Sequence, residues 1–140
     1  MLRDNAGRLL ISVAAVITTI APVRADWSTS HVFSSQWSPH ARFHGVTYLG
    51  MAVTLAITAA LSLLWGRPPR RETTAAAAMI PIAYWSPFFL APLVPGTALE
   101  DPGHPVPRVA GLPANLLGAA ATTASAALGW YLDLRLRASR

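Results

Sequence analysis

The stretch VTYLGMAVTLAITAALSLLW, residues 46–65, contains no charged side chain. An α-helix rises 1.5 Å per residue, so about 20 residues cross the roughly 30 Å hydrocarbon layer of a bilayer. The stretch therefore predicts a transmembrane helix. The turn-forming run Gly66-Arg67-Pro68-Pro69 is expected to end it.

Three further apolar runs accompany this one. Residues 75–95 and 112–132 are equally free of charge, and residues 9–25 form a shorter run behind Arg3 and Arg8. We therefore expect an all-α fold, a four-helix transmembrane bundle that forms one integral membrane domain over residues 1–140. The helices are predicted at residues 9–25, 46–65, 75–95 and 112–132, and the outer loops at residues 26–45 and 96–111.

The first run has two interpretations. A basic start, a short apolar stretch and Val23-Arg24-Ala25 are typical of a secretory signal peptide with its cleavage site. Pro22, where a span could end, and Trp27, at an interface, fit a retained and tilted helix instead. Residues 1–25 are thus either a cleaved leader or a retained helix, and both interpretations place Asp26 outside.

The composition narrows the possible functions. Hydrophobic residues make up 53% of the chain and charged residues 12%, whereas soluble domains carry about 25% charged residues. There is no cysteine, which excludes disulfides, thiolate metal sites and thiol catalysis. All basic residues are arginines, and they form no stripe among aromatic residues, which argues against a nucleic acid partner. Membrane lipid is the expected partner.

The arginines indicate the orientation. Cytoplasmic loops of membrane proteins are enriched in basic residues. With the N-terminus inside, the predicted inner segments contain Arg3, Arg8, Arg67, Arg70, Arg71, Arg135, Arg137 and Arg140, and the outer ones Arg24, Arg42 and Arg108. Both termini are therefore expected in the cytoplasm, in a multi-pass protein of the bacterial inner (plasma) membrane.

Small residues recur at intervals of four along the second predicted helix: Gly50, Thr54, Thr58 and Ser62. Helices in lipid associate through close packing, which small side chains permit. This face is therefore predicted to contact a second copy of the chain or another membrane partner.

The start of that helix is predicted at Ser38-Pro39, a cap hydroxyl followed by a proline in the first turn. His40 and His44 then lie one turn apart on one face, an HxxxH motif. The residues that continue this face are expected to point into the bundle: Thr47, Met51, Thr58 and Ser62.

The third predicted helix is rich in prolines: Pro81, Pro87, Pro92 and Pro95. A proline removes a backbone donor and frees a carbonyl one turn earlier. We expect either a simple kink that packs against its neighbours, or a distorted helix that forms one wall of a pocket with Tyr84, Trp85 and Ser86.

The two outer segments contain all four histidines and two adjacent acids: His31, His40, His44, His104, Glu100 and Asp101. Glu100 and Asp101 are expected to compensate Arg42 or a protonated histidine. Together with Arg42 these residues are the candidate ligand-binding site, whereas the catalytic residues stay unknown. A plain interfacial cluster, in which the histidines hydrogen-bond the outer loops, is the alternative.

Two histidines at this spacing can chelate one metal ion. Zinc-protease chemistry needs a glutamate after the first histidine, and Ala41 stands there. If His40 and His44 recruit further outer ligands, zinc, copper, iron or manganese would suit the site. Without a metal, Arg42 would bind an anionic group and a histidine would transfer protons.

The run Trp37-Ser38-Pro39-His40-Ala41-Arg42-Phe43-His44 resembles a motif, W-P-P-H-A-R-F-H, of a family of small bacterial and fungal membrane proteins of unknown function. Ser38 departs from it conservatively. The resemblance implies a four-helix integral membrane fold and draws attention to His40, Arg42 and His44. It implies no activity.

These features predict a membrane protein with a ligand-binding or catalytic site for a lipid or small molecule at its extracytoplasmic face. The alternative is a structural or accessory membrane subunit without chemistry. Whether the protein is an enzyme is left open by the sequence.

Overall fold

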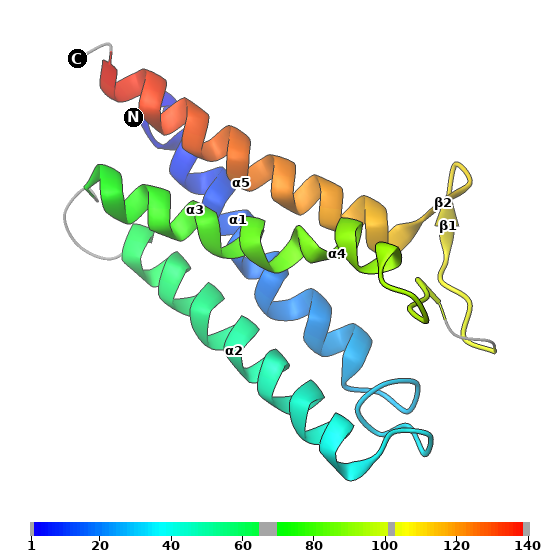
Figure 1. The fold of residues 1–140 in the computed structure, drawn as a ribbon. Helices are drawn as coiled ribbons and strands as arrows, with labels where there is room; N and C mark the ends of the chain where they lie inside the picture. Colours follow the sequence, from blue (N-terminus) through cyan, green and yellow to red (C-terminus); the bar gives the residue numbers. More distant parts are fainter. Residues whose placement is uncertain (1, 65–69, 101–102, 139–140) are drawn as a thin grey trace.

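The computed structural model describes residues 2–64, 70–100 and 103–138, with the side chains of residues 2–4 left aside. Four long helices dominate it: α1 (Leu2–Asp26), α2 (Pro39–Leu64), α3 (Arg71–Trp85) and α5 (Ala114–Ala138). A short helix α4 (Pro87–Leu90) and a 3₁₀ turn η1 (Ala91–Leu93) continue the line of α3. The helices lie side by side, and both chain ends lie at one end of the molecule (Figure 1).

Three helical segments are long and apolar enough to cross a membrane: Asn5–Asp26, Pro39–Leu64 and Arg71–Leu93. The predicted mostly helical fold is confirmed to that extent. The observed helices α1 and α2 begin earlier than the predicted apolar runs, because the helical conformation continues into their polar flanks. At α2 the reason is visible, since the Ser38 hydroxyl accepts a hydrogen bond from the Ala41 amide at 3.1 Å, as its predicted capping role requires.

The third predicted helix is interrupted by a turn at Ser86, directly before Pro87. Ser86 itself keeps helical dihedrals, φ −57° and ψ −38°, so the interruption comes from Pro87, which has no amide hydrogen to donate. The Ser86 hydroxyl donates to the Ile82 carbonyl at 2.5 Å, and the chain then resumes as α4 and η1. Pro81, in contrast, lies inside α3 and is buried.

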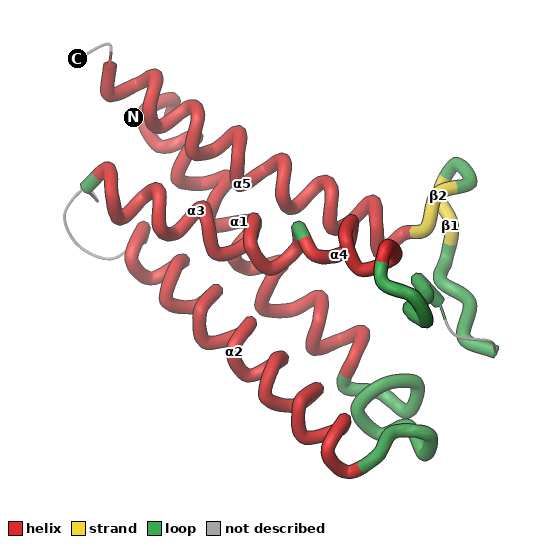
Figure 2. The backbone as a smooth tube through the Cα atoms, in the orientation of Figure 1, coloured by secondary structure: helices red, strands yellow, loops and turns green. Residues whose placement is uncertain are grey.

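A short β-hairpin, with two residues in each strand, precedes α5. The sequence predicted only a loop and the start of a helix there. Strands β1 (Arg108–Val109) and β2 (Leu112–Pro113) pair antiparallel across Ala110 and Gly111 (Figure 2). Both turn residues have positive φ, 51° and 80°, as a tight hairpin turn requires. The loop before the hairpin is fixed to the start of α5, because the Asn115 side chain donates to the Leu99 carbonyl at 3.1 Å.

The core consists mostly of alanines, which allow close helix packing: Ala14, Ala15, Ala52, Ala56, Ala59, Ala77, Ala78, Ala119 and Ala126. The closest approach joins α1 and α5. A Cβ placed on Gly129 would lie 2.5 Å from the Gly7 carbonyl oxygen and 2.8 Å from a side-chain carbon of Ile11. The two helices thus touch backbone to backbone at these glycines.

An ionic cluster lies beside that contact, at the end that holds both termini. Asp133 is 5% exposed, and its carboxylate accepts from Arg137 Nε at 2.7 Å and lies 3.8 Å from Arg8 Nε. Arg137 also donates to the Thr74 hydroxyl at 3.3 Å. We call these four residues the ionic cluster, and it connects α1, α3 and α5.

The predicted orientation of α2 about its own axis is wrong. Its buried face consists of Gly45, Leu49, Ala52, Ala56, Ala59 and Leu63. The stripe expected to point inward is exposed: Thr47, Met51, Thr58 and Ser62. The Thr47 and Thr58 hydroxyls donate to the carbonyls of Phe43 and Thr54, one turn earlier in the same helix, both at 2.8 Å. They therefore need no hydrogen-bond partner from another helix.

Candidate functional site

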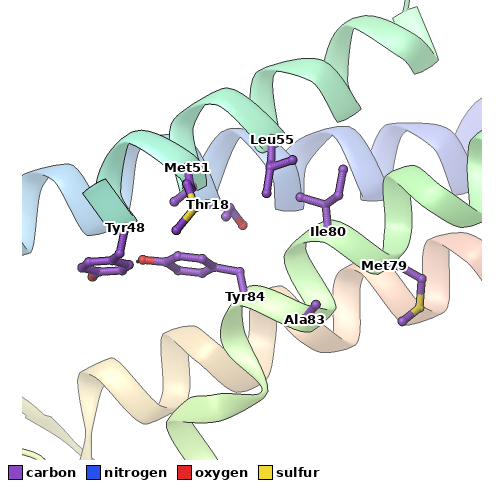
Figure 3. Close-up of a pocket in the computed structure, with 9 residues that line it drawn as sticks. Thr18, Tyr48, Met51, Leu55, Met79, Ile80, Ala83 and Tyr84 are labelled. Atoms are coloured by element: carbon purple, nitrogen blue, oxygen red, sulfur yellow. Dashed lines mark hydrogen bonds between the residues drawn. The ribbon is translucent and has the colours of Figure 1, made fainter. Parts of the chain in front are cut away.

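A pocket of about 440 Å³ opens between α2 and α3, with α1 behind it (Figure 3). Small side chains on both helices, Ala52 and Ala83, leave room there. The complete lining is Thr18, Tyr48, Met51, Ala52, Leu55, Met79, Ile80, Ala83 and Tyr84. The proline-rich helix therefore contributes a wall, as one of its two predicted interpretations required, through Tyr84 but without Trp85 or Ser86.

The side-chain lining is apolar except for three hydroxyl groups. The Thr18 hydroxyl is already used, because it donates to the Ala14 carbonyl and accepts from Trp85 Nε1, both at 2.8 Å. This buried hydrogen bond also explains why Trp85 lies where α3 ends and α4 follows, away from the ends of the predicted span. The hydroxyls of Tyr48 and Tyr84 are the remaining side-chain polar groups of the lining.

The two tyrosines form a hydrogen-bonded chain that ends on a carboxylate. Tyr84 extends across the pocket towards Tyr48, and its hydroxyl donates to the Tyr48 hydroxyl at 3.3 Å (Figure 3). Tyr48 in turn donates to Asp26 Oδ2. The two rings are nearly parallel, with centroids 6.1 Å apart. We call Tyr84, Tyr48 and Asp26 the tyrosine chain.

Asp26 is held at the end of α1 by the loop that follows. Its backbone carbonyl accepts from the Val32 amide at 3.0 Å, and Val32 is buried. His31 Nε2 lies 3.7 Å from Asp26 Oδ1, whereas His31 Nδ1 lies 3.0 Å from the Ser30 hydroxyl. The carboxylate therefore has the tyrosine chain on one side and a partly exposed histidine on the other.

The predicted histidine pair forms but lies apart from the pocket lining. His40 Nε2 and His44 Nε2 are 3.1 Å apart, their rings meet edge to face, and both residues are exposed. Arg42 points to the preceding loop, where it donates to the Ser34 carbonyl at 3.1 Å. In the described residues no three His, Cys, Asp or Glu side chains gather as a metal site would need. Metal binding by the pair stays a prediction.

Glu100, one of the two predicted acidic partners, is bound to the hairpin and the segment before it. Glu100 accepts from Arg108 at 2.7 Å and from the Val106 amide at 2.9 Å, so its partner is Arg108 and not Arg42. The Val106 amide, followed by the Arg108 guanidinium, holds the pKa of the Glu100 carboxyl below its usual value. His104 is exposed, and Asp101 lies outside the described residues.

Among the six predicted site residues that the structure describes, only His31 approaches the tyrosine chain, through Asp26. In the tyrosine chain, sequence reasoning missed both Tyr48 and Asp26 as site residues. A signal was present for Tyr48, since it falls inside a predicted apolar segment, as Tyr84 does, and a buried hydroxyl usually has a hydrogen-bond partner.

The chain belongs to a family of unknown function, DUF6640, which it matches over residues 10–138. Comparisons with curated proteins and with solved structures give no match.

Proposed function

We propose that this protein is an integral membrane protein that binds an amphiphile in the pocket between α2 and α3. The ligand is a lipid or small apolar molecule with one polar group, and that group contacts the tyrosine chain. The observation that carries the proposal is the combination of an apolar pocket of about 440 Å³ with two tyrosine hydroxyls in its lining, which are hydrogen-bonded to a carboxylate outside the lining. Ligand pockets of about 300–1,000 Å³ with few polar groups are typical of small-molecule sites.

The proposed topology is a four-helix bundle with both termini in the cytoplasm. The biased distribution of arginines supports this orientation, as does the position of both termini at one end (Figure 1). The less apolar α5 would cross the membrane together with α1 and α3, against which it packs. Asp26 and His31 would then lie at the extracytoplasmic face of a bacterial plasma membrane.

Because the ligand would enter from lipid, its alkyl part gains little from leaving one apolar environment for another. Shape and the polar group must then supply the selectivity. The tyrosine chain is placed to do so, because its hydroxyls are the side-chain polar groups of the lining that the rest of the fold does not use.

The test is photolabelling of the protein in nanodiscs with dodecanol that carries a diazirine in its chain. Replacing Ala83, which lines the pocket, by tryptophan should fill the pocket and reduce specific labelling at least tenfold. The matched control is Ala76→Trp, on an exposed position of the same helix outside the lining. Equal labelling of wild type and Ala83→Trp would contradict the proposal.

A second candidate function is that of an accessory subunit that assembles through α2. The supporting observation is that Gly50, Thr54, Thr58 and Ser62 are all exposed on this chain. Thr58→Leu should then weaken cross-linking to a second copy or to a membrane partner, whereas Ala121→Leu, at an exposed position of α5, should not. Unchanged cross-linking in Thr58→Leu would exclude this face.

A further inference from the structure

We infer that the ligand's polar group is a hydroxyl that donates a hydrogen bond to Tyr84, and that Asp26 determines this preference through Tyr48. The inference rests on the proposed amphiphile site and names the class of its ligand as a neutral long-chain alcohol. It follows from the direction of the hydrogen bonds in the tyrosine chain.

The direction originates at the carboxylate. An ionised carboxylate can only accept hydrogen bonds, and a tyrosine hydroxyl has one proton to donate. Tyr48 must therefore use its proton on Asp26. The Tyr48 oxygen is left as an acceptor, and the Tyr84 hydroxyl uses its own proton there, at 3.3 Å.

The consequence appears at the end of the tyrosine chain that faces the pocket. With its proton committed to Tyr48, Tyr84 offers only oxygen lone pairs to a ligand. A hydroxyl can donate to these lone pairs, whereas an ether, ketone or ester has no proton to give. An ether, ketone or ester would therefore leave its own oxygen without a donor, or, if Tyr84 turned its proton to the ligand, would break the hydrogen bond to Tyr48. Both outcomes are unfavourable away from water.

The surroundings favour a neutral head group over a charged one. None of the described residues that line the pocket has a basic side chain to attract a phosphate or a carboxylate, and Asp26 would repel either one. An ammonium group would be attracted by Asp26 only at a distance, because Asp26 is not itself part of the lining, and it would lose its hydration without gaining a direct ion pair.

The experiment is competition in nanodiscs between the diazirine dodecanol probe and two unlabelled competitors, dodecanol and dodecyl methyl ether. The measured quantity is the ratio of their half-inhibitory concentrations, which does not depend on the probe's own affinity. We expect dodecanol to compete about tenfold better on the wild-type protein, as one hydrogen bond would give.

Two variants test the role of the tyrosine chain. Tyr48→Phe frees the Tyr84 proton for the ligand, and Asp26→Asn allows the direction of the chain to reverse, because an amide both donates and accepts. Both variants should bring the ratio close to one, chiefly through better competition by the ether. Tyr131→Phe, at an exposed tyrosine of α5 that accepts from Arg135, is the matched control and should keep the wild-type ratio.

The outcomes separate the inference from the proposed function. Equal competition by alcohol and ether on the wild type would overturn the inference and leave the amphiphile site intact. An unchanged tenfold ratio in folded Tyr48→Phe and Asp26→Asn would overturn the role of Asp26. Failure of the probe to label the pocket at all would overturn the proposed function itself.

Discussion

The two ends of the molecule each contain an aspartate that binds side chains from other helices, with opposite results. At one end Asp133 binds charged partners, Arg137 at 2.7 Å and Arg8 at 3.8 Å, beside the backbone contact between α1 and α5. At the other end Asp26 accepts from Tyr48, and a pocket remains open between α2 and α3.

The two ends differ in the partners of the aspartate and in the space that remains between the helices. In the ionic cluster, the Asp133 carboxylate is paired with arginine side chains. Beside it, Gly7 and Gly129 allow α1 and α5 to touch, so no space remains between these helices. In the tyrosine chain, the Asp26 carboxylate accepts from a neutral hydroxyl, which accepts from a second one, and small alanines beside the two rings leave room for the pocket. The first arrangement stabilises the fold, and the second can recognise a ligand.

The largest effect on stability is expected at the glycine contact. Gly129→Ala should lower the free energy of unfolding by about 3 kcal/mol, because the new methyl group meets the Gly7 backbone, which cannot move aside as a side chain could. Gly118→Ala is the control in the same helix, since a Cβ there has nothing within 4 Å. Denaturant titration in detergent measures both. A loss at Gly129 no greater than at Gly118 would contradict the close contact.

The second largest effect is the difference between the two aspartates in the free energy of unfolding that their substitution costs. Asp133→Asn removes the carboxylate from beside two guanidinium groups and should cost about 2 kcal/mol, less than for a fully buried pair because Arg137 is partly exposed. Asp26→Asn keeps an acceptor for Tyr48 and should cost less than about 1 kcal/mol. The same titration ranks them, and the reverse order would refute the assignment of the stabilising role to the ionic cluster.

The smallest effect concerns pH and the hairpin. Because the folded hairpin lowers the pKa of Glu100, its contribution is present above the usual value of about 4.3 and is lost as the pH falls through the lowered value. Hydrogen exchange should show the protection of the Val106 amide falling in this acidic range. In Glu100→Gln the protection should lose this pH dependence, because the amide does not titrate. If the protection of the Val106 amide increased on acidification, it would contradict a stabilising role of the ionised Glu100 carboxylate.

Sequence reasoning located the helical segments because uninterrupted apolar length is a strong signal, and Ser38-Pro39 marked the start of α2. It failed on the orientation of α2, because in an apolar helix the exposed and buried faces carry similar residues. Small and hydroxyl residues satisfy themselves along the helix and can lie on either face, as Thr58 does.

The candidate site was harder to predict, because it depends on contacts across helices. Nothing local shows that Asp26, Tyr48 and Tyr84 meet, since they come from three different helices. The histidine pair was visible because its spacing lies within one helical turn. Glu100 meets Arg108 because of how the chain turns between them and forms the hairpin. The prolines and glycines of this segment predicted turns, but not which residues the turns bring together.

The most direct test of the account is to identify the residues that the diazirine dodecanol probe labels in the wild-type protein, by peptide mass spectrometry. The account predicts that labelling which excess dodecanol abolishes falls on the pocket lining, at Met51, Leu55, Met79 and Ile80. Competable labelling at His40 and His44, or none above the background of the lipid-exposed surface, would contradict it.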